Sequence, residues 1–160
     1  MENLSKKALN YCLYLLGRQS YSRKQLRDKL TRKKYEPQII EDTLEKLSQW
    51  QYLDDRKFAA DFAAQRLKFK PRGPRLVEQE LRTKGIGRDL ARQVTVDTMA
   101  RLELNEEKLA RAALTKKIGS YKKINADKGK SRALNFLIRQ GFSYEIANKL
   151  VREYWSQKDF

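Results

Sequence analysis

The 160-residue sequence contains no histidine and a single cysteine, Cys12, and these absences exclude several kinds of site. A zinc centre built on cysteine and histidine is excluded, and so is acid–base catalysis by imidazole. An internal disulfide would need a second cysteine. Cys12 lies at helical spacing from Ala8 and Leu16, which favours a small buried apolar residue in a reducing cytoplasm.

Long hydrophobic runs are also missing. No apolar stretch approaches the roughly 20 residues that a membrane-spanning helix needs, and the N-terminus lacks the apolar stretch of a signal peptide. We therefore expect a cytoplasmic protein with no membrane partner. With only three prolines and 40% hydrophobic residues, the chain has enough apolar content to fold.

Acidic residues are scarce relative to basic ones. The chain has 20 Asp and Glu against 36 Lys and Arg, a formal net charge of +16. Such an excess favours a polyanionic partner, which can be DNA, RNA or an acidic protein surface. The alternative is a basic surface that only keeps the protein dispersed, and composition alone leaves both open.

Apolar residues recur every three or four positions along nearly the whole chain, which predicts an all-α protein. No stretch alternates apolar and polar residues for long enough to predict a sheet. We expect helices near residues 5–18, 22–34, 37–50, 55–69, 73–84, 88–102, 106–118, 127–140 and 144–157. Residues 119–130 are predicted to form a mobile loop, because they include four lysines and little apolar content.

Three similar segments divide the chain. Each has a leucine, a short polar tail, a turn and a new helix, beginning at Leu30, Leu81 and Leu137. A spacing of about fifty residues predicts a repeat that holds three helices. The units are expected at residues 1–53, 54–104 and 105–160.

Turn and capping residues agree with this division. Gly85 and Gly141 stand where a helix would end in a left-handed conformation, which glycine adopts without a Cβ penalty. Lys34 holds the same place in the first unit, where we expect a looser or differently shaped turn. Ser22 and Gln25 form a predicted capping box at a helix start.

Asp54 and Asp55 form an acidic pair directly before a predicted helix. We interpret them as helix starters that satisfy free N–H groups and meet the positive end of the helix dipole. A magnesium-dependent nuclease would need further inward-facing carboxylates, whereas the other acids are scattered among lysines and arginines. Gly73 and Pro74 start a helix and fall short of a phosphate-binding loop. We therefore expect no cofactor, no metal and no catalysis.

Three basic stretches, one in each unit, favour a single extended binding stripe over three merely solvated faces. Arginines around Gly73 are expected to make specific two-pronged contacts, and lysines beside the predicted loop to give diffuse attraction. Tyrosines among these cations are able to stack on bases, whereas the spacing of Trp50 and Trp155 favours packing. The candidate contacts for DNA or a protein partner are Arg23, Lys24, Arg27, Arg66, Lys68, Arg72, Arg75, Lys84, Lys116, Lys117, Lys122 and Lys123.

The stretch from Tyr52 to Ile86 carries an ordered set of motifs that resembles the RecX family. Leu-Asp-Asp opens a helix that contains Phe58, Arg66 lies near its end, a Gly-Pro precedes the next helix, and Glu-Leu-x-x-Lys-Gly-Ile closes that helix. The flanking segments are similar to the first repeat of the family and, more weakly, to the last. The motif residues that we take as structural are Asp54, Asp55, Phe58, Gly73, Pro74, Gly85 and Gly141.

This resemblance implies three tandem three-helix units in an elongated, curved array without right-angle bends, lying in the groove of the RecA–DNA filament. It implies a non-catalytic regulator that binds RecA, its filament, and single- or double-stranded DNA without sequence preference. Filament growth, ATP hydrolysis and coprotease activity would be inhibited, and we expect a monomer. The alternative is a stand-alone DNA-binding protein in which Lys84–Ile86 forms a helix-turn-helix, although that turn recurs three times.

Overall fold

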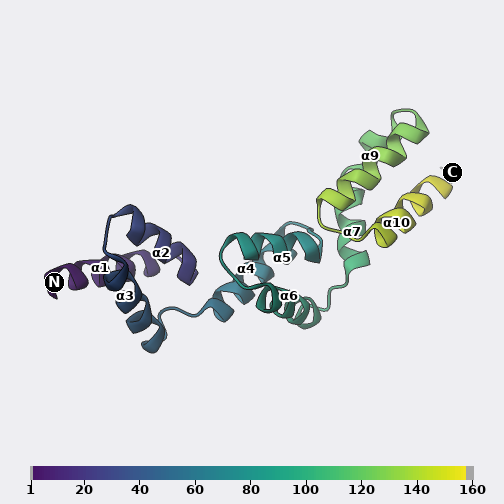
Figure 1. The fold of residues 1–160 in the computed structure, drawn as a ribbon. Coiled ribbons are helices and arrows are strands. Elements are labelled where there is room, and N and C mark those ends of the chain that lie inside the picture. The colour runs from purple at the N-terminus through teal and green to yellow at the C-terminus, as the bar shows by residue number, and fades with distance from the viewer. Residues whose placement is uncertain (1, 158–160) are drawn as a thin grey trace.

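The structure, a computed structural model, describes residues 2–157, and this part of the chain contains ten α-helices and no strand. The prediction of an all-α fold is therefore confirmed. The helices form three successive groups, α1–α3, α4–α6 and α7–α10, in an elongated, curved arrangement with the termini at opposite ends (Figure 1). Their bounds are α1 (Glu2–Leu16), α2 (Arg23–Arg32), α3 (Pro37–Gln49), α4 (Asp55–Phe69), α5 (Pro74–Thr83), α6 (Arg88–Arg101), α7 (Glu106–Thr115), α8 (Ile118–Lys122), α9 (Ala126–Arg139) and α10 (Tyr144–Ser156).

The mobile loop predicted for residues 119–130 is wrong. The short helix α8 occupies the start of this segment, and α9 begins before its end. Ile118 and Tyr121 pack against the core of the third unit. Gly129 is buried so closely beneath α8 that a Cβ there would lie 2.4 Å from the carbonyl oxygen of Tyr121. A few apolar contacts are thus enough to fix a segment whose composition resembles a loop.

Five helices end in the same left-handed turn. After each helix, a residue with positive φ donates its N–H three residues back, and the next residue donates its N–H five residues back. This pair of bonds satisfies carbonyl groups that would otherwise lack a partner at the helix end. The residues with positive φ are Lys34 (62°), Gln51 (61°), Gly85 (89°), Glu103 (54°) and Gly141 (89°).

The looser turn expected at Lys34 is wrong, because Lys34 has the same handedness and the same two bonds as the glycines. Its N–H donates to Thr31 at 2.9 Å, and the N–H of Tyr35 donates to Leu30 at 3.3 Å. The difference lies in the surroundings. Lys34 is exposed and its side chain extends into solvent. A side chain at Gly85, which is itself exposed, or at the buried Gly141 would instead collide with a residue of a neighbouring unit.

The equivalent helices α2, α5 and α9, which carry Leu30, Leu81 and Leu137, meet end to end. Ser22, the N-cap of α2, donates its hydroxyl to the carbonyl oxygen of Lys84, which ends α5. Gly73, the N-cap of α5, donates its N–H to the carbonyl oxygen of Gln140, which ends α9, at 2.7 Å. In both places the positive end of one helix dipole meets the negative end of the next. One type of contact therefore joins all three units.

Glycine is what permits this approach. A Cβ on Gly85 would lie 2.3 Å from the Cβ of Lys24. A Cβ on Gly141 would lie 2.3 Å from the backbone nitrogen of Leu76, and one on Gly73 would lie 2.1 Å from the carbonyl carbon of Gly141. Since these distances are far below van der Waals contact, any side chain at the three positions would push the units apart.

Two apolar clusters form the core. One lies within the first unit and includes Cys12, Leu26 and Leu44, while the other runs continuously through the second and third units. Cys12 is fully buried, as its spacing predicted, and this burial raises the pKa of its thiol to about 11. Between residues 2 and 157, no helix is long and apolar enough to cross a membrane.

Replacing Gly141 with Val should lower the free energy of unfolding by more than about 1 kcal/mol, because a β-branched residue is disfavoured at positive φ. The close contact with Leu76 adds to this cost. Urea denaturation followed by circular dichroism measures the change. The matched control is Gly119→Val in α8, where a new Cβ would meet nothing within 4 Å. This control should change stability by less than about 0.5 kcal/mol, and equal losses in both variants would contradict the assignment.

Candidate nucleic-acid and partner interface

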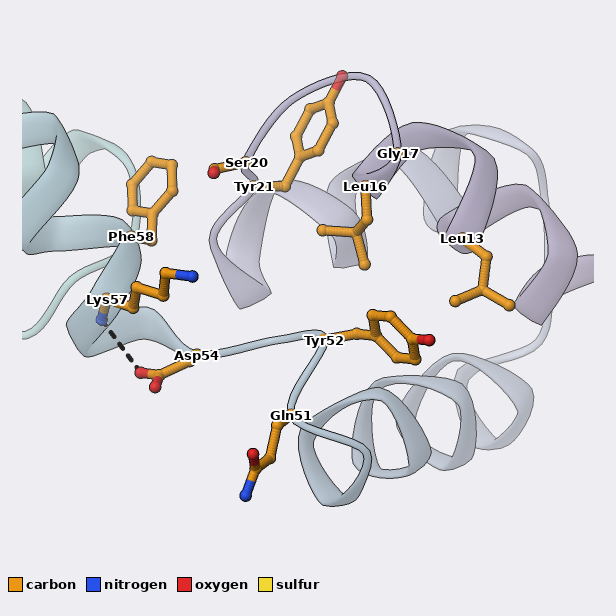
Figure 2. A pocket seen from close by; sticks show the side chains of 10 residues that line it. All are labelled: Leu13, Leu16, Gly17, Ser20, Tyr21, Gln51, Tyr52, Asp54, Lys57 and Phe58. Atoms are coloured by element: carbon orange, nitrogen blue, oxygen red, sulfur yellow. Dashed lines mark hydrogen bonds between the residues drawn. The ribbon is translucent and has the colours of Figure 1, made fainter.

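The two aspartates at the start of α4 both accept hydrogen bonds from backbone N–H groups of the protein. Asp54 caps the helix by accepting a hydrogen bond from the N–H of Lys57 at 3.1 Å (Figure 2). Asp55 accepts one from the backbone N–H of Arg23 at 2.8 Å and so links the second unit to the first. Within residues 2–157 no group of three or more cysteines and carboxylates is placed to hold a metal ion. The two aspartates thus have structural partners.

An open pocket of about 330 Å³ lies beside Asp54, between the end of α1 and the start of α4. Leu13 and Leu16 of α1 point toward Tyr52 across it (Figure 2). The charged residues of its lining are Asp54, which is committed to its cap, and Lys57. The pocket is a surface hollow between two units. Its lining offers no nucleophile activated by a base.

Candidate cations of the first unit are held by acids of the same unit. Arg27 makes a two-pronged pair with Glu41 of α3, with Nε–Oε1 at 2.8 Å and Nη2–Oε2 at 3.1 Å. Arg23 reaches the same carboxylate at 3.3 Å, and Lys24 pairs with Asp28 at 2.8 Å. Hydrogen bonding raises the pKa of Arg27 and lowers the pKa of Glu41. Arg23 and Arg27 therefore join α2 to α3, whereas Lys24 pairs within α2.

In the second unit, two of the candidate arginines share one carboxylate. Arg66 Nε lies 2.9 Å from one oxygen of Glu80, and the Arg72 guanidinium pairs with the other. All three side chains are partly buried, so the pairs tie α4 and the following segment to α5. Lys68 and Arg75 differ, since both are exposed and neither has an acidic partner within 4.0 Å in residues 2–157.

Candidate lysines of the third unit lie around α8 rather than beside a flexible loop, which corrects the expectation for this stretch. Lys117 Nζ lies 5.9 Å from the ring centroid of Phe136, a favourable cation–π arrangement. Lys116 and Lys123 are exposed, and Lys122 is half-buried at the end of the helix. The structure therefore gives these lysines a fixed backbone.

Two candidates from different units are brought together at the first junction. The side chain of Lys24 covers Gly85, and the carbonyl of the adjacent Lys84 accepts the hydroxyl of Ser22. The three basic stretches are otherwise distributed along the length of the molecule, one per unit (Figure 1). This placement gives each unit its own cationic surface.

A groove of about 600 Å³, which the sequence did not predict, lies where the second unit meets the third. Arg88 and Arg92 line it, together with the exposed Val96. Their spacing of four residues could have indicated a shared surface, because residues four apart lie on one face of a helix, here α6. The full lining is Pro74, Arg75, Glu78, Arg88, Arg92, Val96, Met99, Ala100, Leu104, Asn105 and Glu106.

The spacing of the two tryptophans predicted that both pack against the core, and the structure agrees for only one of them. Trp155 is half-buried and packs against the core of the second and third units. Trp50, the C-cap of α3, is 52% exposed. The packing prediction for Trp50 is therefore wrong.

These features define a helical repeat protein whose charged groups lie on open surfaces rather than in an enclosed cavity. Family models described as the first, second and third three-helix domains of RecX match residues 8–47, 54–94 and 105–151, respectively. The chain belongs to the RecX family.

Known relatives agree with this assignment. "Regulatory protein RecX" of Listeria innocua serovar 6a is 30% identical over 98% of this chain and 57% of its own length. The chain thus spans little more than half of that relative. The protein of the same name from Pelodictyon phaeoclathratiforme is 29% identical over 94% of this chain and 91% of its own length. The crystal structure of RecX from Lactobacillus salivarius matches with a TM-score of 0.82 and 21% identity, covering 96% of this chain and 97% of that one. At that identity the structural match supports the fold alone.

Arg72→Gln should lower the free energy of unfolding by about 1 kcal/mol, because it removes one partner from the partly buried carboxylate of Glu80. Arg75→Gln is the matched control, since Arg75 is exposed and lies three residues away. It should change stability by less than about 0.5 kcal/mol. Urea denaturation of the two variants makes the comparison. Indistinguishable stabilities would mean that Arg72 has no structural role.

Glu41→Gln should destabilise the first unit at neutral pH and have little effect in acid. Hydrogen bonds from Arg27 and Arg23 lower the pKa of Glu41 below its ordinary value of 4.5. A lowered pKa in the folded state contributes stability above the ordinary value, and this stability is lost as pH falls through the folded value. Since Glu41 is exposed, the effect should stay below about 1 kcal/mol. The difference in Tm between wild type and variant should shrink from pH 7 to pH 3; a constant difference would contradict this account.

Proposed function

We propose that this chain is a non-catalytic regulator that binds the RecA recombinase filament and restrains it, inhibiting filament growth, ATP hydrolysis and coprotease activity. The observation that carries the proposal is membership of the RecX family along residues 8–151, whose relatives are named regulatory proteins. We further propose that it acts in the cytoplasm as a monomer.

The architecture suits a partner that is itself a repeating polymer. Three units joined by equivalent contacts present cations at intervals along one long molecule, so that several weak contacts are made at once. Linked contacts of this kind raise the overall affinity well above that of each one. A filament of recombinase subunits on DNA offers acidic groups and phosphates at regular spacing, and binding to the DNA would be independent of sequence.

The groove between the second and third units is the best candidate for the protein contact. Arg75, Arg88 and Arg92 supply fork-shaped donors that match carboxylates, and the exposed Val96 supplies an apolar surface beside them. This combination fits an acidic, partly apolar protein surface better than a phosphate backbone, which has no apolar group to cover Val96. The exposed lysines would then attract the filament at longer range.

A stand-alone helix-turn-helix protein is the less favoured function. In that class the turn leads into a helix that enters the major groove of DNA. Here the turn at Gly85 lies against the first unit, through the contacts of Ser22 and Lys24. Selection of one specific duplex from random sequences would nevertheless support it against the filament regulator.

The decisive test is a pull-down of the full chain with RecA filaments assembled on single-stranded DNA, beside free RecA and free DNA. Binding should be strongest to the filament and should inhibit its ATP hydrolysis. Affinity should fall by a factor of about 10³ or more between 50 and 200 mM salt, as expected when many counterions are released. Failure of the wild-type chain to bind the filament would overturn the proposal, and a flat salt response would mean that apolar contacts dominate.

Replacing the three groove arginines, Arg75, Arg88 and Arg92, with Gln should weaken filament binding at least about tenfold, the loss of some 1.4 kcal/mol. The matched control changes Lys46, Arg56 and Arg139, which are exposed, carry the same total charge and do not line the groove. At one salt concentration, the control should lose less than about threefold. Equal losses would assign the effect to net charge.

A further inference from the structure

One face of the first unit combines tyrosines with cations. Tyr11, Tyr14 and Arg18 follow one another at intervals of three and four residues, so they lie on the same side of α1 and its C-terminal turn. The Arg18 guanidinium lies 5.6 Å from the ring centroid of Tyr14 and donates a hydrogen bond to its hydroxyl at 2.6 Å. Tyr14 is 59% exposed, so this ring is not used to fill the core.

Helix α2 extends the same face. Lys33 Nζ lies 4.9 Å from the ring centroid of Tyr11, and Lys29 Nζ lies 5.2 Å from that of Tyr21. Because Lys29 and Lys33 are one helical turn apart, the two lysine–tyrosine pairs are neighbours. We call Tyr11, Tyr14, Arg18, Tyr21, Lys29 and Lys33 the tyrosine–cation face.

No acid competes for these cations within the surrounding sequence. Residues 3–27 contain neither aspartate nor glutamate, and the next acid, Asp28, pairs with Lys24. This differs from the other cation clusters, where Glu41 and Glu80 hold arginines in place. The positive potential of the tyrosine–cation face is therefore left for a ligand.

The combination is not imposed by the repeat. When the units are aligned on Leu30 and Leu81, the position of Tyr14 is occupied in the second unit by Gln65. The first helix of the second unit also carries acids, including Asp61. Packing of a three-helix unit thus requires neither the exposed ring nor the absence of acids.

We infer that the tyrosine–cation face binds single-stranded nucleic acid. A base stacks on the exposed ring of Tyr14, and the phosphates beside it meet the neighbouring cations. Tyr11 and Tyr21 pack against the core of the first unit and hold Lys33 and Lys29 in place. A duplex is a poor fit, because its base faces are already stacked on one another. An acidic peptide would use the cations but leave the exposed ring without a partner. The inference rests on the proposed function only in assigning its DNA contact, and it is tested without recombinase.

The experiment measures fluorescence anisotropy of a labelled 15-nucleotide oligothymidylate and of an abasic deoxyribose-phosphate oligomer of equal length, with the full chain. Tyr14→Ala should weaken binding to oligothymidylate at least about fivefold, as expected for loss of one stacked base, and binding to the abasic oligomer less than twofold. Tyr14→Phe, which keeps the ring, should bind both like wild type. Arg18→Gln and Lys33→Gln should weaken binding to both oligomers, because they remove phosphate contacts.

The matched control is Tyr144→Ala in α10, since Tyr144 is 60% exposed but lies outside the tyrosine–cation face. It should change neither affinity by more than about twofold. The inference is overturned if Tyr14→Ala weakens both oligomers equally, if it behaves like Tyr144→Ala, or if wild type prefers a 15-base-pair duplex. The predicted pattern without filament binding would instead refute the proposed function and leave this site standing.

Discussion

The way in which the three units are joined depends on one recurring contact, the end-to-end meeting of the equivalent helices α2, α5 and α9. A helix end has carbonyl groups without partners, and a donor at the start of a neighbouring helix satisfies one of them when the two ends are brought together. The hydroxyl of Ser22 and the N–H of Gly73 make this bond at equivalent places. Because the bond is short, the backbones must nearly touch. That requirement fixes where glycine is needed.

The same constraint explains why the first unit departs from the pattern. Its helix-ending turn at Lys34 has the left-handed geometry found at Gly85 and Gly141, but its side chain is exposed. The left-handed conformation costs a non-glycine residue on the order of 1 kcal/mol, which a folded unit tolerates at a few positions. A Cβ beneath a neighbouring helix would not be tolerated. The choice between lysine and glycine at this turn therefore reports whether another unit stacks there.

The helices, the repeat and the capping residues were predictable from the sequence, because each of these is a local property. Apolar spacing predicts a helix from a few turns of chain, and the capping box at Ser22 needs only residues three apart. The partners of Arg27 and Arg66 were out of reach, since Glu41 and Glu80 lie fourteen residues away on other helices. Helix α8 was not predicted, because its local composition is that of a loop. The contacts that stabilise it are tertiary.

The two junctions differ in strength, and this difference separates the two proposed surfaces. The second and third units share one continuous apolar core beside the groove that Arg88 and Arg92 line. The first unit has a core of its own, and the hydrogen bonds of Ser22 and Asp55 help join it to the second. Such bonds are worth about 1 kcal/mol each, far less than a shared core. The unit that carries the tyrosine–cation face is thus the one whose position the rest of the molecule constrains least, and a flexible single strand is a ligand that can follow it.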